Sequence, residues 1–466
     1  MIKRLLCTAF LVLSLSSATA GAAPRRRATP SLPWLRAEGT KIVNDRGKTV
    51  RLKGLFLPNN TWGNWIWPIS AQLEKEGKDA MIKPTEQDAW VLTDQDFEIF
   101  AKLKLNYVVY DVNYELFEAG NVKREANLDK LVGHVKRFNA LRIYVVVNFA
   151  GSPGLNVNTG GGERDKPGDK RLKTMFEDRN FQDQHVEFLR AVVSRLKDES
   201  GVGGWILTDE PFCPSDADGG LAAFRAAYNR FAREIRKIDA RHLIIAQGFN
   251  ARERNPGERY WDGPSNNFKE DQGEQGITYE HTIVQLDPDI RNVAYDIHMF
   301  DPWDFAAEGA STYNAAEIER ILAGFVKLVN DEFKAPLFIT SYGINRKQSS
   351  EKRVAWLDTY HALFDKYGVS AAYFDYKDDV NPFADQGGYM GVFGHYVRIN
   401  TDLEFDEGKY SFKNAGAKES ARKSGTAVLE KYFVRDGKPV PIANMDEAVL
   451  EAFQRYWARS KAGIVN

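Results

Sequence analysis

The chain has 466 residues, and its 63 Lys and Arg nearly balance its 64 Asp and Glu, for a formal net charge of -1. This balance gives no electrostatic reason to bind nucleic acid or an acidic polymer, so we expect no nucleic-acid partner. With only 2 Cys, the chain is not a disulfide-stabilised scaffold, and a large apolar core must hold it together.

The N-terminus has the pattern of a secretory signal peptide. Lys3 and Arg4 precede the apolar run LLCTAFLVLSL, and small residues follow, which predicts cleavage after Ala20 or Ala23. Cleavage would remove two cations, change the formal charge from -1 to -3, and leave Cys213 without a disulfide partner. The apolar run is short for a membrane span, so an uncleaved anchor is the weaker alternative. We therefore expect a secreted or periplasmic protein with no stable membrane span in the mature chain.

Downstream, apolar strand-like runs alternate with helical patterns. Residues 39–56 are expected to form two short strands around a turn at 44–47. The strand-like runs cover residues 50–56, 106–112, 142–149, 204–209, 242–248, 292–298, 336–341 and 370–376. The helical patterns include residues 94–105, 184–199, 221–238, 315–333, 351–367 and 444–463.

Eight strands that are apolar on both faces predict a parallel sheet buried on both sides. Eight is the strand number of a (β/α)8 TIM barrel, an α/β fold. A doubly wound open sheet is the alternative, but no Gly-x-Gly-x-x-Gly follows the first strand to support its dinucleotide-binding form. The expected organisation is a signal peptide (1–23), a basic tether (24–37), a barrel with an N-terminal β-hairpin (38–400) and a C-terminal helical extension packed on the barrel (401–466).

Four motifs lie at predicted strand ends, where a TIM barrel carries its active site. They are GKTVRLKGLFLPNNTWGNW (47–65), GGWILTDEPF (203–212), AYDIHMFDPWDF (294–305) and APLFITSYGI (335–344). In this order the motifs resemble those of glycoside hydrolase family 5, the cellulase-like branch of the retaining barrel glycosidases, over about residues 39–394. The resemblance implies hydrolysis of O-glycosidic bonds in a β-linked polysaccharide or oligosaccharide. No His, Cys and Asp cluster has metal-ligand spacing, so we expect neither a metal nor another cofactor.

The resemblance assigns Glu210 to the general acid/base of the family. Asp209 falls where the family has an asparagine that binds a sugar hydroxyl, and we expect Asp209 to contact substrate. A purely structural alternative is that the two carboxylates cap the helix after Pro211. On an extended strand, adjacent side chains leave opposite faces, so the carboxylate that works with Glu210 is expected from across the barrel.

The family position of that second carboxylate, the nucleophile, falls at Ser341, which cannot form the covalent glycosyl intermediate. His298 of the sixth-strand motif is retained. Other positions that surround the nucleophile in the family are substituted: the second-strand arginine by Val109, the third-strand histidine of an Asp-x-His run by Ala150, the sixth-strand tyrosine by Phe300, and the eighth-strand tryptophan by Phe374.

These substitutions leave two interpretations of the function. The first is an exported glycoside hydrolase in which Glu210 acts without the standard retaining mechanism. An inverting mechanism needs only a base that activates water, and Asp301 and Asp375 are the candidates, although either could simply cap a helix. A Ser341–His298 nucleophile pair is a weaker idea. The second interpretation is a non-catalytic glycan-binding pseudoenzyme on the same barrel.

Aromatic residues at the same end of the barrel predict a glycan-binding groove, because sugar rings stack on aromatic faces. Each of them could equally seal a loop of its own. The expected substrate-binding aromatic residues are Trp62, Trp65, Trp303, Phe374 and Tyr389.

Overall fold

The computed structural model divides after Pro30, and everything described below belongs to the unit Ser31–Asn466. The predicted signal peptide and its cleavage sites therefore lie outside the described residues. The structure describes residues 31–57, 92, 94–155, 174–213, 220–248, 250–251, 283–299, 315–344, 348–374, 376, 403–406, 409–412 and 447–461.

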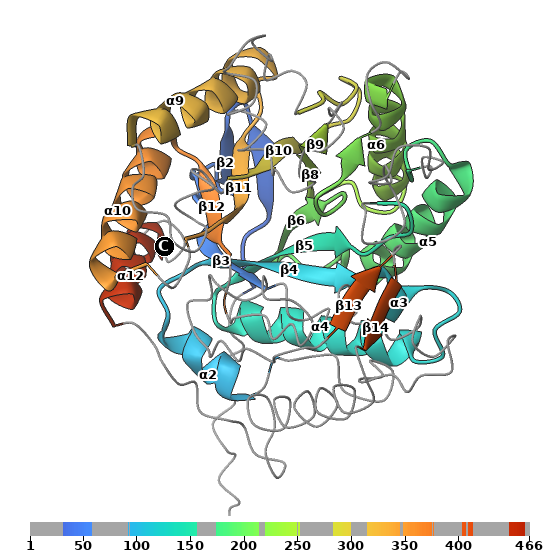
Figure 1. Cartoon of the computed structure of the whole chain (residues 1–466), viewed down its shortest axis with the longest axis horizontal. Helices are drawn as coiled ribbons and strands as arrows, with labels where there is room; N and C mark the ends of the chain where they lie inside the picture. Colours follow the sequence, from blue (N-terminus) through green and yellow to red (C-terminus); the bar gives the residue numbers. More distant parts are fainter. Residues whose placement is uncertain are drawn as a thin grey trace, which may run out of the picture. The chain divides into compact units, whose positions relative to one another are not determined.

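Eight parallel strands pair in a closed ring, in which the last strand along the chain pairs with the first. This closure confirms the TIM barrel and excludes the doubly wound open sheet. All eight strands overlap the predicted apolar runs (Figure 1). In chain order they are β3 (Lys53–Leu57), β4 (Tyr107–Asn113), β5 (Tyr144–Ala150), β6 (Val202–Ile206), β8 (Leu243–Gln247), β10 (Val293–His298), β11 (Leu337–Tyr342) and β12 (Ser370–Tyr373).

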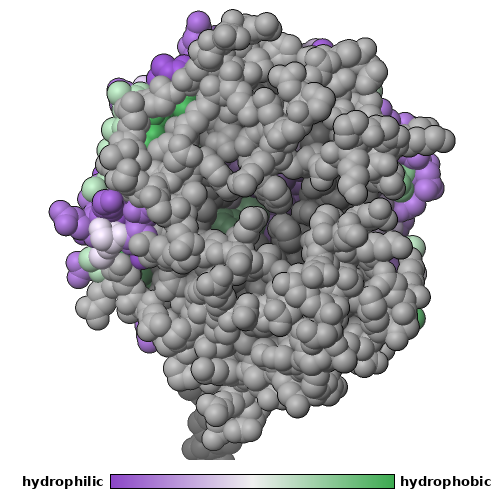
Figure 2. Space-filling view, in the orientation of Figure 1, coloured by the Kyte–Doolittle hydropathy of each residue, from purple (hydrophilic) through white to green (hydrophobic). Residues whose placement is uncertain are grey.

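Helices surround the strands in Figure 1. At the N-terminus of α10, the Ser349 side chain caps the helix by accepting a hydrogen bond from Lys352 N. At its C-terminus, the helix ends at Gly368, which has the left-handed φ of +75°. In Figure 2 the described atoms at the rim of the view are mainly hydrophilic, as expected for the outer faces of such helices. Within the described residues, no helix combines the length and apolarity that crossing a membrane requires. The helices are α2 (Asp94–Lys102), α3 (Tyr114–Phe117), α4 (Arg124–Ala140), α5 (Arg179–Leu196), α6 (Gly220–Arg236), α9 (Ala315–Val326), the π-helical turn η5 (Lys327–Glu332), α10 (Ser350–Tyr367) and α12 (Glu447–Lys461).

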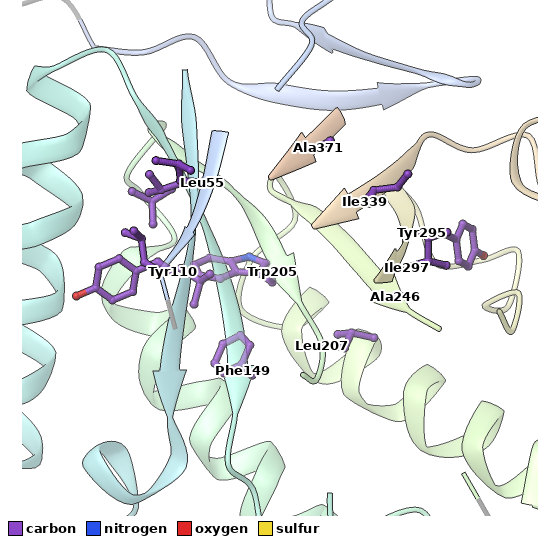
Figure 3. Close-up of a cluster of buried hydrophobic side chains, with 14 of the residues drawn as sticks. Leu55, Tyr110, Phe149, Trp205, Leu207, Ala246, Tyr295, Ile297, Ile339 and Ala371 are labelled. Carbon is purple, nitrogen blue, oxygen red and sulfur yellow. The ribbon is translucent and has the colours of Figure 1, made fainter. Parts of the chain in front are cut away.

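Two apolar layers form because successive strand residues point to opposite faces. One cluster fills the barrel interior and includes Phe56, Val109 and Phe338. The other lies between strands and helices and includes Tyr110 and Trp205, which Figure 3 shows among their neighbours. Both faces of the strands are thus buried, which explains why their sequences are apolar throughout.

An N-terminal hairpin packs on the apolar interior cluster of the barrel. Strand β1 (Leu35–Glu38) pairs with β2 (Lys41–Asn44) across Gly39, which has φ +58°. The hairpin thus turns earlier than predicted, although the expected turn after Asn44 also forms and joins β2 to Thr49 by a single bridge. Leu35, within the segment expected as a tether, is buried in the interior cluster.

Helix α12 is the described helix that follows the last barrel strand, β12. It packs against β3 and α10, and Gln454 accepts a hydrogen bond from Lys104 N, which lies just after α2. It therefore occupies the place between the helix that follows β11 and the helix that follows β3. The C-terminal helix of the predicted extension is thus the eighth helix of the barrel by position.

The contacts of α12 with the barrel are both polar and aromatic. Lys53 on β3 forms an ion pair with Asp365 of α10 and lies 4.0 Å from the centre of the Tyr456 ring. Burial lowers the pKa of Lys53, and Asp365 opposes this shift. The Tyr456 ring also stacks on His361 of α10, with 3.9 Å between ring centres. A buried lysine is tolerated here because both its charge and its stem have partners.

Two further pairs of short strands are present outside the barrel. They are β7 (Phe212–Cys213) with β9 (Asn250–Ala251), which run parallel, and β13 (Leu403–Asp406) with β14 (Lys409–Phe412), which run antiparallel.

If α12 is an integral part of the barrel, then Trp457→Ala should destabilise the whole barrel. Trp457 is 0% exposed, and truncation of a buried Trp to Ala costs about 3–5 kcal/mol. The measurement is urea unfolding followed by far-UV circular dichroism. The control is Arg455→Ala, which removes an exposed ion pair with Asp358 and should cost less than about 1 kcal/mol. An unchanged transition for Trp457→Ala would contradict the assignment.

Candidate active site

Polar side chains replace apolar ones at the C-terminal ends of neighbouring barrel strands. The strand alternation places Asp111 on the same face of β4 as the interior residue Val109, and Asn148 on the same face of β5 as Val146. Asp111 and Asn148 are direct partners in the strand ladder. The same pattern continues around the mouth with Gln247 on β8 and with Asp296 and His298 on β10.

Asn148 joins two carboxylates. Its Nδ2 donates to Asp111 Oδ1 at 2.7 Å and to Asp209 Oδ1 at 2.7 Å. Burial, followed by the nearby charge of Asp209, raises the pKa of Asp111 well above its usual value, although the bond from Asn148 opposes this. Burial and the charge of Glu210 raise the pKa of Asp209 to about 6, against the opposing effects of His298 and Asn148. These carboxyls therefore keep protons to higher pH than exposed aspartates do.

Asp209 and Glu210 both contact this site, contrary to the expectation that they leave opposite faces. Strand β6 ends at Ile206, and Glu210 has φ +42°, a left-handed conformation that costs about 1–3 kcal/mol in a non-glycine residue. The chain is held in place by bonds from Asp209 N to Phe149 O at 2.9 Å and from Glu210 N to Gln247 Oε1 at 2.5 Å. The expectation was wrong because the chain is no longer extended there.

Glu210 and His298 are in direct contact. His298 Nδ1 lies 2.8 Å from Glu210 Oε1, and the His298 ring meets Phe56 edge-on at 6.1 Å. Burial lowers the pKa of His298, but the hydrogen bond and charge of Glu210, together with Asp296 and Asp209, outweigh this and raise the pKa to about 9. The predicted acid/base and the predicted histidine therefore form one hydrogen-bonded pair.

Asp296 holds the neighbouring strands together. It accepts hydrogen bonds from Thr340 N at 2.8 Å, Thr340 Oγ1 at 2.6 Å and Gln247 Nε2 at 2.7 Å. Burial raises the pKa of Asp296, and the bonds from Gln247 and Thr340 and the charge of His298 oppose this shift. Asp111 on β4 and Asp296 on β10 therefore both hold hydrogen bonds to other residues of the mouth.

Ser341 lies beside His298, which it faces in the ladder of β10 and β11. The register shifts at this point, because one extra residue of β11 is accommodated against both β10 and β12. Phe374, just after β12, packs against Phe56 with 5.5 Å between ring centres. The structure therefore brings Glu210, after β6, to the same end of the barrel as His298 on β10 and Ser341 on the adjoining strand β11, with Phe374 just after β12.

No group of three or more His, Cys, Asp or Glu that could hold a metal occurs in the part of the chain that the structure describes.

Several predicted residues lie outside the described residues. The predicted residues that are not described are Trp62, Trp65, Trp303, Tyr389, Phe300, Asp301 and Asp375.

Sequence reasoning missed Asn148, Gln247 and Thr340. The available signal was a single polar residue near the end of an otherwise apolar run, as in YVVVNF and LIIAQ. Asn148 also stands at the Asp of the expected Asp-x-His run, while Asp209 stands at an expected Asn. The two substitutions exchange an amide and a carboxylate between residues that are hydrogen-bonded here.

Comparisons with known proteins agree with this architecture. The matching family model is "Cellulase (glycosyl hydrolase family 5)", over residues 73–380, more than half of the chain. No curated protein matches the chain significantly.

Among solved structures, an endo-glycoceramidase II from Rhodococcus sp. is 15% identical with a TM-score of 0.51, and the match covers 76% of this chain and 79% of that one. An endoglucanase from Thermotoga maritima is 15% identical with a TM-score of 0.49, and the match covers 73% and 92%. A β-glucanase from Saccharophagus degradans, solved with cellotetraose, is 13% identical with a TM-score of 0.47, over 85% and 94%. At 15% identity, the similarity to the endo-glycoceramidase II supports the fold alone.

Ionisation of Asp209 should make the protein less stable as the pH rises. Its pKa in the folded protein, about 6, exceeds the ordinary aspartate pKa of 3.8, so its stabilising contribution is present below about pH 4 and is lost as the pH rises through 6. Asp209→Asn should flatten this slope and raise the unfolding free energy at pH 7 by about 1–2 kcal/mol.

The test is urea unfolding between pH 4 and pH 7. The exposed substitution Asp358→Asn is the control and should leave the slope unchanged. A steeper slope in Asp209→Asn would refute the assignment.

Proposed function

Because the chain belongs to glycosyl hydrolase family 5, we propose that it acts on the O-glycosidic bonds of a β-linked polysaccharide. The observation that carries the proposal is the contact between Glu210 and His298 at the barrel mouth. A general acid must present its carboxyl to the leaving oxygen in a fixed direction. The bond to His298 Nδ1 fixes one oxygen of Glu210, and the strained backbone at Glu210 aims the side chain.

Glu210 is the proposed general acid/base, and Asp209 the proposed contact for a sugar hydroxyl. A carboxylate accepts hydrogen bonds from hydroxyl groups, and one oxygen of Asp209 is already held by Asn148. Phe374 is the proposed aromatic contact of the described mouth, with Trp62, Trp65, Trp303 and Tyr389 as further stacking residues.

The route of hydrolysis is proposed to avoid a glycosyl-enzyme ester. Ser341, at the proposed nucleophile position, has no carboxylate to form one. Inversion needs a base that activates water, with the two carboxyl groups about 6.5–9.5 Å apart. Asp111 and Asp296 are engaged in internal hydrogen bonds, so Asp301 and Asp375 remain the proposed bases.

A second candidate function is glycan binding without hydrolysis. It is favoured by three residues together: Ser341, Val109 and Ala150 all lack the groups that would support a nucleophile. Val109 is 0% exposed within the apolar interior cluster, where an unpaired arginine would carry a high desolvation cost. The two candidates share the barrel and the groove and differ only in turnover.

Export is part of the same proposal, because a polysaccharide substrate lies outside the cell. The basic, apolar and small-residue pattern at the N-terminus supports it. N-terminal sequencing of the protein recovered from the medium or periplasm should give a mature chain that begins at Gly21 or Pro24. An intact Met1 on the cytoplasmic protein would reject export.

Turnover on a panel of β-glucans and β-mannans separates the two candidates. For a hydrolase, Glu210→Gln should lower kcat about 10²–10⁴-fold, because it removes the transferable proton. Its glycan affinity, measured by affinity electrophoresis, should stay close to that of the original protein. Ser341→Ala should retain turnover, because the serine does not attack the sugar in this proposal. Equal, near-zero rates for the original protein and Glu210→Gln, with glycan affinity intact, would establish the binding protein instead.

A further inference from the structure

Gln247, on β8, makes three hydrogen bonds around the Glu210–His298 pair. Its side-chain oxygen Oε1 accepts from Glu210 N at 2.5 Å. Its nitrogen Nε2 lies 2.7 Å from Asp296 Oδ2 and 2.8 Å from His298 Nε2. The residue is 3% exposed, so water does not compete freely for these groups.

These contacts fix which end of the amide faces His298. The N–H of Glu210 is a backbone donor at every pH, so the group opposite it must be an acceptor, Oε1. Reversing the amide would place its nitrogen against this N–H and its oxygen against the Asp296 carboxylate. The NH₂ group of Gln247 therefore points at both Asp296 and His298.

An amide NH₂ has two hydrogens and cannot accept a hydrogen bond. One hydrogen is directed at Asp296, and the other at His298 Nε2. His298 Nε2 must then accept and carry no proton, which leaves the ring proton on Nδ1, facing Glu210 Oε1 at 2.8 Å. We propose that Gln247 is a positioning residue that holds His298 as the neutral Nδ1–H tautomer and so directs a single N–H at Glu210.

Charged groups around His298 oppose this effect. Glu210 and Asp209 face it from the end of β6 and Asp296 from its own strand, and by themselves these groups raise its pKa to about 9, which favours the doubly protonated ring at pH 7. The other described neighbours named above, Phe56 on β3 and Ser341 on β11, carry no charge. A doubly protonated His298 would require Gln247 to turn, with loss of its bonds to Glu210 N and Asp296. In this proposal, the bonds of Gln247 to Glu210 N and Asp296 outweigh the charge of the three carboxyl groups and keep the ring neutral at pH 7.

The consequence concerns the proposed acid/base, and in this respect the inference rests on the proposed function. An imidazolium next to Glu210 would hold it as a carboxylate in an ion pair. A neutral Nδ1–H orients the same oxygen with less preference for the charged form. Glu210 can then take up and release a proton while its position stays fixed.

The test is nuclear magnetic resonance of protein labelled with ¹⁵N in the histidine rings, with His298→Gln to assign the signals. At pH 7 the intact protein should show one protonated nitrogen, Nδ1, and an unprotonated Nε2 for His298. Gln247→Glu replaces the donor by an acceptor of the same shape and should make His298 doubly protonated at this pH. Its titration midpoint should rise by at least one unit.

Two further variants keep the test decisive. Gln454→Glu, on α12, adds the same charge far from His298 and should leave its tautomer unchanged. Gln247→Met removes the donor without adding charge and should also raise the midpoint, so it serves if Gln247→Glu does not fold. A doubly protonated His298 in the intact protein at pH 7 would overturn the proposal. So would a His298 in both Gln247 variants that keeps the protonation state and midpoint of the intact protein. The tautomer is read without any turnover, so absence of hydrolysis would count against the proposed function and not against the role of Gln247.

Discussion

The alternation of side chains between the inside and the outside of the closed barrel determines where polar groups can stand. Inward positions midway along the strands, such as Val109 and Ile245, are sealed in an apolar cluster. The next inward position, one pleat further, is polar: Asp111 on β4 and Gln247 on β8. Because the cluster below these groups offers no hydrogen bonds, they must bond to one another at the mouth. The two networks around Asn148 and Gln247 follow from this constraint.

Much of the fold was predictable from the sequence, and the site only in part. The strands were recognised because burial on both faces makes each an apolar run. Glu210, His298 and Ser341 were identified through the resemblance to glycoside hydrolase family 5 of the motifs at the ends of those runs. Gln247 was missed because its role depends on a backbone N–H that lies 37 positions away in the chain. The helical pattern of α12 was also visible, but its place in the ring depends on contacts with β3 and α10 that no local pattern encodes.

The incorrect expectation for Asp209 shows where the periodicity argument stops. Alternation holds only while the backbone is extended, and the left-handed residue Glu210 ends it. The strain is offset by bonds to β5 and β8, on either side of β6. As a result two neighbouring carboxyl groups serve different partners: Asp209 bonds to Asn148, whereas Glu210 bonds to His298.

The amides of Asn148 and Gln247 explain how the mouth holds so many carboxyl groups. A cation beside a carboxylate would favour its charged form, whereas an amide satisfies its oxygens without adding charge. The excess negative charge is therefore relieved by protons, as the raised pKa values of Asp111, Asp209 and Asp296 indicate. The carboxyl groups of such a mouth keep their protons to higher pH than exposed carboxyl groups do. The same arrangement suits a proton donor such as Glu210, whether or not a nucleophile accompanies it.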